Sequence, residues 1–214
     1  MLPRFDRNAR AAGLAMLSAF LHACATPGAL SSRGDSAAAV ADEIPDAALA
    51  SYERAITAME AGDRVEAELE LEHLVLEYPG YAGPYVNLAI LYQEDARADE
   101  AEIVLDRALT LRPENAVASN QLGIVLRSQG RFAEAEAAYE AAIAADAEYA
   151  IAYMNLGILL DIYLRRPEEA LANYERYQEL LAEPDRAVAG WIVDLRRRLG
   201  IPAEPQRVAQ EISP

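Results

Sequence analysis

The chain has few of the residues on which catalysis and metal binding usually depend. It contains one cysteine and two histidines among 214 residues, and a single cysteine excludes an intramolecular disulfide. A glycine-rich phosphate loop, G-x-S-x-G, H-E-x-x-H and CxxC are all missing from the sequence. We therefore predict a protein that is not an enzyme, without catalytic residues, cofactor or metal. An enzyme with an unmarked carboxylate site is the alternative.

Positive charge and aromatic side chains are also scarce. Nineteen basic residues face 35 acidic ones, which gives a net charge of −16. Such a surface repels phosphate backbones and anionic lipids, so we expect no nucleic-acid partner. Aromatic residues make up 7% of the chain although 53% is hydrophobic, because alanine is abundant. This composition is typical of a folded protein built from closely packed helices rather than sheets.

The first 23 residues resemble the signal peptide of a bacterial lipoprotein. Three arginines begin the segment: Arg4, Arg7 and Arg10. The apolar run 11–23 follows and is too short to span a bilayer as a helix. Its last three residues and the cysteine that follows resemble the lipobox: Leu21-His22-Ala23-Cys24. His22 departs from the pattern, in which this position is usually small or aliphatic. The resemblance implies acylation of Cys24, for example with palmitate. A plain secretory signal and an uncleaved anchor are the alternatives.

Residues 24–46 are predicted to form the lipidated cysteine and a flexible tether, because they are small, polar and without apolar periodicity. Acyl chains would have to hold so acidic a protein at a membrane. Ala25 follows the cysteine in place of the aspartate that often signals inner-membrane retention. We therefore expect a lipid-anchored protein of the bacterial cell envelope, at the outer membrane and facing the periplasm.

Self-similarity at a fixed spacing is the main pattern in the chain. Three tripeptides recur 34 residues apart: Asn87-Leu88-Ala89, Gln121-Leu122-Gly123 and Asn155-Leu156-Gly157. Further along each unit, at the start of its second helix, stands an alanine, and a larger residue comes four positions after it. These pairs are Ala101 and Leu105, Ala135 and Tyr139, and Ala170 and Tyr174. A period of this length predicts stacked helical pairs. The units are 48–81, 82–115, 116–149 and 150–184, and the last carries one extra residue between Gly157 and Ala170.

These units resemble the tetratricopeptide repeat family. The unit 116–149 carries the best match, at Leu122, Gly123, Gly130, Phe132, Ala135, Tyr139 and Ala142. The small Gly123 and Ala135 allow the two helices of the unit to approach closely, and Gly130 permits the turn between them. The resemblance implies an all-α, right-handed superhelical solenoid of four helix-turn-helix units over residues 47–184.

Residues 185–200 are predicted to form a capping helix, which a solenoid needs to cover its last apolar face. Asp185 is its expected N-cap, and Gly200 with Pro202 ends it. Its apolar residues share one face: Val188, Trp191, Ile192, Leu195 and Leu199. Residues 201–214 are predicted to be a disordered tail.

In this family the first helix of each repeat lines a concave wall, so the resemblance implies a partner-binding groove. Its floor would be four isoleucines spaced by 34: Ile56, Ile90, Ile124 and Ile158. Its two sides would be Tyr52, Val86, Asn120 and Met154, and Met59, Gln93, Arg127 and Asp161. Asn87 and Asn155 would bond a ligand backbone or cap local backbone groups. A partner's extended segment or amphipathic helix would cover the isoleucines, with the chain's own C-terminal helix or helix packing as alternatives.

The resulting hypothesis is a membrane-tethered adaptor that grips a segment of an envelope protein during assembly of a cell-envelope complex. The layout resembles the pilotin lipoproteins of type IV pilus systems. The alternative is an organising module of a polysaccharide or peptidoglycan complex. Four alternating glutamates, Glu66, Glu68, Glu70 and Glu72, are interpreted as a solvated helix face, because no calcium-loop pattern surrounds them.

Overall fold

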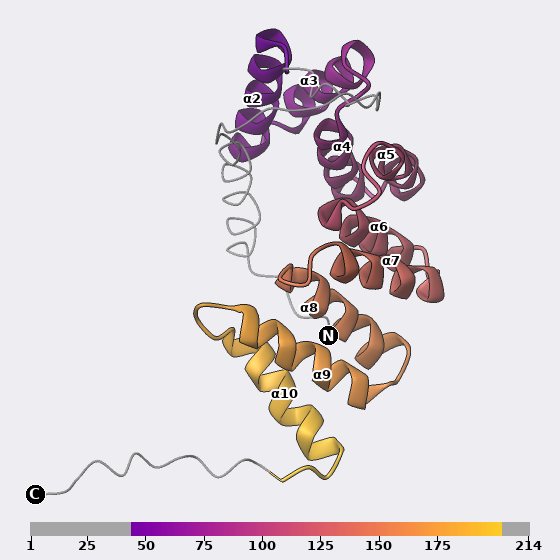
Figure 1. The fold of residues 1–214 in the computed structure, drawn as a ribbon, viewed down its shortest axis with the longest axis vertical. Helices are drawn as coiled ribbons and strands as arrows, with labels where there is room; N and C mark the ends of the chain where they lie inside the picture. Colours follow the sequence, from indigo (N-terminus) through magenta and orange to yellow (C-terminus); the bar gives the residue numbers. More distant parts are fainter. Residues whose placement is uncertain (1–43, 203–214) are drawn as a thin grey trace, which may run out of the picture. The chain divides into compact units, whose positions relative to one another are not determined.

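The computed structural model describes residues 44–202, and every regular element within this part is helical (Figure 1). The predicted signal peptide, Cys24, nearly all of the tether and nearly all of the tail lie outside the described residues. Among the described helices, none combines the length and hydropathy that crossing a membrane requires.

The helices follow one another in pairs. The first two pairs are α2 (Asp46–Ala61) with α3 (Arg64–Glu77), and α4 (Ala82–Glu94) with α5 (Ala98–Leu111). The next two are α6 (Ala116–Ser128) with α7 (Phe132–Ala145), and α8 (Ala150–Ile158), continued by η1 (Leu159–Tyr163), with α9 (Pro167–Leu180). Helix α10 (Arg186–Arg198) follows and packs on α9. Each pair packs together, and its second helix packs on the first helix of the next pair, which confirms the predicted all-α solenoid.

The turn inside each pair places one residue in the left-handed backbone region. These residues are Gly62, Ala96, Gly130 and Arg165, with φ of 76°, 59°, 79° and 55°. They occupy the same position in successive units, once the extra residue of the last unit is counted. Glycine adopts this conformation without steric cost, whereas Ala96 and Arg165 adopt it against their preference. The turn geometry therefore belongs to the repeat and persists where glycine is lost.

Close approach within two pairs depends on a glycine facing a buried tyrosine. A Cβ at Gly123 would lie 2.5 Å from Cε1 of Tyr139, and one at Gly157 would lie 2.6 Å from Cδ1 of Tyr174. Both rings are almost fully buried, at 0% and 1% exposure. The Tyr139 hydroxyl is also buried and has no hydrogen-bond partner among the described residues. These glycines therefore leave the space that the aromatic rings fill.

The extra residue of the fourth unit is absorbed in a π-helical turn, η1. The backbone N–H of Leu164 donates to the carbonyl of Leu159 at 3.1 Å, and that of Arg166 donates to Leu160 at 2.9 Å. Such wide turns accommodate a single inserted residue without ending the helix. The turn brings the exposed Tyr163 against Phe132, with ring centroids 4.8 Å apart.

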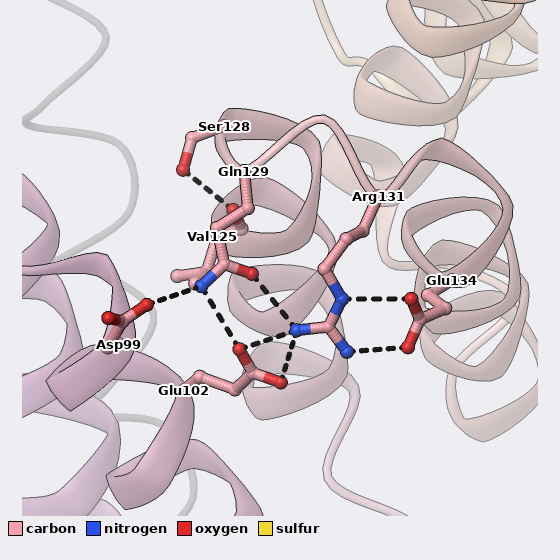
Figure 2. A network of polar contacts seen from close by, with 7 residues as sticks. All are labelled: Asp99, Glu102, Val125, Ser128, Gln129, Arg131 and Glu134. Atoms are coloured by element: carbon pink, nitrogen blue, oxygen red, sulfur yellow. Dashed lines mark hydrogen bonds and ion pairs between the residues drawn. The ribbon is translucent and has the colours of Figure 1, made fainter.

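Arginines placed just before the second helices tie neighbouring units together. Figure 2 shows Arg131, which donates to Glu134 of its own helix at 2.8 and 2.5 Å and to Glu102 of α5 at 2.6 and 2.7 Å. Gln129 joins the network through Glu102, at 3.1 Å. The same arrangement occurs twice more, with Arg97 between Glu68 and Glu100 and Arg166 between Glu136 and Glu169. We call these three sets the arginine braces.

Replacing Arg131 with glutamine is expected to lower Tm by a few degrees at low ionic strength. The brace is half-exposed, so its contribution is that of a networked surface ion pair and is screened by salt. Thermal melts of the wild type and Arg131→Gln at low and molar salt would measure this. Arg107→Gln is the control, because Arg107 is exposed and has no ion pair among the described residues. A deficit that is independent of salt would contradict an electrostatic brace.

Candidate functional site

The four isoleucines of the predicted groove lie on the first helices of the four pairs, but they are covered to different extents. Ile56 of α2 and Ile90 of α4 are half-exposed, and neither belongs to the two buried clusters of the solenoid. Ile124 of α6 packs partly against the second cluster, and Ile158 of α8 is buried within it. The row is therefore most open on the first two units.

Three further apolar residues extend this row and were not among the predicted site residues. Leu49, Val117 and Ile151 are 36–37% exposed. Each precedes an isoleucine of the row by seven residues, so it lies two turns away on the same helix face. The repeat spacing of 34 combined with a step of seven would have identified them in the sequence. We call these three residues and the four isoleucines the isoleucine face.

In α4 the corresponding position is Gly83, which leaves room for the side chain of Tyr52 from the preceding unit. A Cβ at Gly83 would lie 3.2 Å from the hydroxyl oxygen of Tyr52. Burial raises the pKa of Tyr52, and its bond to Asn87 opposes that shift. On the first two units the isoleucine face is therefore bordered by a tyrosine that is held in place by the next helix.

The predicted side that contains Tyr52, Val86, Asn120 and Met154 is largely engaged between units. The amide nitrogen of Asn87 donates to the hydroxyl of Tyr52 at 2.8 Å, and that of Asn155 donates to the side-chain oxygen of Asn120 at 2.9 Å. Val86 is buried, and Met154 packs partly against the second cluster. These asparagine amide nitrogens thus connect successive first helices, a role that neither sequence-based interpretation included.

The opposite side is half-exposed: Gln93, Arg127 and Asp161 are polar, whereas Met59 packs partly against the first cluster. Asp161 accepts a hydrogen bond from Arg198 of α10 at 2.7 Å. Within residues 44–202, Arg127 has no ion-pair partner and is half-buried. The other arginines of this part that lack an ion pair are all exposed. A half-buried guanidinium without a carboxylate can pair with an acidic group brought by another molecule.

Helix α10 contacts the last unit. Trp191 packs on Tyr174 of α9 with ring centroids 5.5 Å apart, and Arg196 pairs with Glu175 at 2.8 Å. With the Arg198–Asp161 bond, these contacts place α10 at the α9 end of the stack (Figure 1). The described C-terminal helix thus leaves the isoleucines of α2 and α4 uncovered.

Three of the four alternating glutamates of α3 bind neighbouring side chains, and Glu66 alone of the four is exposed to solvent. Glu70 accepts from Arg54 and Ser51, Glu68 from Arg97 and Glu72 from Tyr92. The bond from Arg54, followed by that from Ser51, holds the pKa of Glu70 below its usual value. In the described part of the chain, no three His, Cys, Asp or Glu side chains gather where they could hold a metal ion. One surface hollow lies at Arg112–Glu114, and a second lies around Asp161, Arg165 and Arg198 and so includes one predicted groove residue, Asp161.

Two family models, both described as tetratricopeptide repeat, match residues 80–148 and 120–183. No curated protein matches the chain. Similar solved structures include PilF of Pseudomonas aeruginosa, at 23% identity over 72% of this chain and 70% of that one, with a TM-score of 0.66. MamA of Desulfovibrio magneticus RS-1 is 22% identical over 74% of this chain and 89% of that one, with a TM-score of 0.62. The first repeat domain of Spaghetti (RPAP3), bound to the HSP90 peptide SRMEEVD, is 24% identical over 56% and 93%, with a TM-score of 0.52.

Proposed function

The chain belongs to the tetratricopeptide repeat family, whose domains act as protein–protein interaction modules, and we propose that it is a non-enzymatic scaffold that holds a partner segment on its isoleucine face. The observation that carries this proposal is that Ile56 and Ile90 are half-exposed and lie outside both buried clusters. Apolar side chains aligned on one face lose contact with water when a partner covers them, which favours binding. An extended segment or an amphipathic helix would fit a row of this kind.

We further propose that the scaffold acts in a bacterial cell envelope, anchored through acylated Cys24. The support is the order of arginines, apolar run and lipobox-like residues at the start of the sequence. In this proposal residues 25–45 give the repeats reach from the membrane, and the partner is an envelope protein whose assembly the scaffold assists, as in a pilus or secretion complex. Arg127 would receive an acidic group of that partner.

The proposal is tested by capture from detergent-solubilised envelopes, with mass spectrometry of the bound proteins. We expect the wild type to retain one dominant envelope protein and the variant Ile56→Glu with Ile90→Glu to lose it, because two charges would be placed in the covered row. Val193→Glu is the matched control, since Val193 is exposed on α10, away from the face. Equal capture by the wild type and a folded double variant would rule out the isoleucine face as the binding site.

Two further variants separate folding from binding and test the anchor. If circular dichroism shows that the double variant is unfolded, Leu49→Glu with Val117→Glu replaces it, because these residues are among the most exposed of the face. Mass spectrometry of purified protein is expected to show a diacylglyceryl group on Cys24, and Cys24→Ala is expected to leave the membrane fraction. An unmodified Cys24 on wild-type protein that is recovered without detergent would refute the anchor but not the binding face.

A further inference from the structure

A second set of large apolar side chains is exposed on the second helices of the first two units. Val65, Leu69 and Leu76 of α3 are 71%, 57% and 80% exposed, and Ile103 of α5 is 68% exposed. The spacing of four and seven residues on α3 places its three side chains along one line of the helix. Ile103 follows Leu69 by 34 residues and therefore occupies the same position in the next unit. We call these four residues the outer stripe.

The fold does not require apolar residues at these positions, because the later units do without them. The position of Val65 is occupied in later units by Asp99, Ala133 and Glu168. That of Leu69 and Ile103 is occupied by Ala137 and Ala172, and that of Leu76 by Thr110, Ala144 and Glu179. Small or polar residues thus occupy the same exposed positions on the second helices of the later units. A cluster of four large apolar side chains on two adjoining helices is therefore a feature of the surface, of the kind that marks contact with another molecule.

The charges around the outer stripe indicate the charge of the molecule that would bind there. Helix α3 contains five glutamates and one arginine, and this arginine, Arg64, is already paired with Glu94 and Asp95. Glu66 has no ion pair in the described part of the chain, and Glu77 pairs with the exposed His73. A second copy of the chain would bring like charges together, and an anionic lipid surface would be repelled. A cationic partner would gain both apolar contact and ion pairs.

A brace arginine links α3 to the start of α5, and both helices pack on α4. The brace arginine Arg97, at the start of α5, donates to Glu68 of α3 at 2.5 Å and to Glu100 of its own helix. Its guanidinium carbon also lies 4.1 Å from the ring centroid of Tyr92 on α4. Leu69 and Ile103 are thus held on helices that are linked directly and through α4, and such pre-organisation favours binding.

We propose that the outer stripe docks an amphipathic helix of another protein, with an apolar line flanked by Lys and Arg. Its apolar line lies on Val65, Leu69, Leu76 and Ile103, and its basic residues pair with Glu66 and Glu77. This surface uses second helices, whereas the isoleucine face uses first helices. The scaffold therefore has two separate binding faces and can bridge two proteins. The inference stands on its own observations and does not depend on the isoleucine face being occupied.

The test uses the full chain and a synthetic peptide of leucine and lysine that forms an amphipathic helix, with binding measured by fluorescence anisotropy. Leu69→Gln with Leu76→Gln is expected to weaken binding by about tenfold or more, because both side chains lose their apolar contact. Glu66→Gln with Glu77→Gln is expected to weaken binding at low salt and less at high salt. A leucine–glutamate peptide of the same pattern and a scrambled leucine–lysine peptide are expected not to bind.

Two control variants identify the surface. Val193→Gln and the isoleucine-face variant Ile56→Glu with Ile90→Glu are both expected to keep the affinity of the wild type. Binding that survives the Leu69 and Leu76 changes, or that is lost only in the isoleucine-face variant, would overturn the proposal. It would equally be overturned if sedimentation showed these leucines to hold two copies of the chain together, or if zwitterionic vesicles bound the wild type and not the leucine variant.

Discussion

Replacing Gly123 with alanine is expected to lower the free energy of unfolding by about 1–3 kcal/mol, the usual cost of overfilling a packed interior. The added Cβ would lie 2.5 Å from Cε1 and 2.6 Å from Cδ1 of Tyr139, both far inside van der Waals contact. The ring is fully buried and cannot swing into solvent to make room. Alanine is the better helix former by about 1 kcal/mol, so a net loss would show that the clash outweighs helix propensity.

Gly190→Ala is the matched control, because Gly190 is an exposed helical glycine of α10 with nothing within 4 Å of an added Cβ. This change is expected to raise stability by about 0.5–1 kcal/mol. Chemical denaturation followed by circular dichroism measures both variants. Combining Gly123→Ala with Tyr139→Leu is expected to recover part of the loss, since a smaller side chain would face the new methyl group. Equal stabilisation by the two alanine changes would show that α6 and α7 do not depend on the glycine for their approach.

Much of the fold could be predicted because the same 34-residue pattern recurs several times in one chain. The recurrence of Gly123 and Gly157 at a spacing of 34 indicates helix pairs more reliably than a single helical stretch does. The conformations of Ala96 and Arg165 could not be read from residue type, because neither favours the left-handed region that both adopt. Their positions relative to Gly62 and Gly130 nevertheless predict them. The place of the π-helical turn depends on which carbonyl accepts each N–H, and composition does not determine that choice.

The sequence predicts which residues of the candidate site share a helix face, but not how deeply each of them is buried or what it contacts. The spacing of the isoleucines identifies one helix face, and the burial of Ile158 against the half-exposure of Ile90 could not be derived from it. That difference arises because the second buried cluster, which includes residues of α10, reaches Ile158. The roles of Asn87 and Asn155 likewise depend on the offset between neighbouring first helices, which brings residues 35 apart together. Periodicity places residues on a face, and helix packing decides what they contact.

The solenoid is expected to unfold when the pH is raised from 10 to 12, because its buried tyrosines resist ionisation. Burial raises the pKa of Tyr92, Tyr139 and Tyr177 to about 12, from an ordinary value of 10.0. Burial also raises the pKa of Tyr174. Above pH 10 the unfolded chain loses these protons and the folded chain keeps them, so the stability present below pH 10 falls as the pH rises. For Tyr139 alone the loss amounts to about 2 kcal/mol at pH 12.

Tyr139→Phe tests this mechanism in a single residue. The Tyr139 hydroxyl is buried without a hydrogen-bond partner among the described residues, so its removal is expected to leave neutral-pH stability unchanged or higher by about 1 kcal/mol. The variant also has no proton to lose at this site, and its alkaline unfolding midpoint is therefore expected at higher pH than that of the wild type. Circular dichroism and the ultraviolet absorbance of tyrosinate, recorded together, would follow unfolding and ionisation.

Tyr163→Phe provides the comparison, since Tyr163 is 45% exposed while it packs on Phe132. Both substitutions remove one phenol from a chain of unchanged length, and at neutral pH both leave the net charge of −16 as it is. General charge repulsion at high pH therefore affects the two variants alike, and only the loss of a buried phenol distinguishes them. If both variants unfolded at the pH of the wild type, ionisation of the other buried tyrosines, rather than of Tyr139, would be the cause of alkaline unfolding.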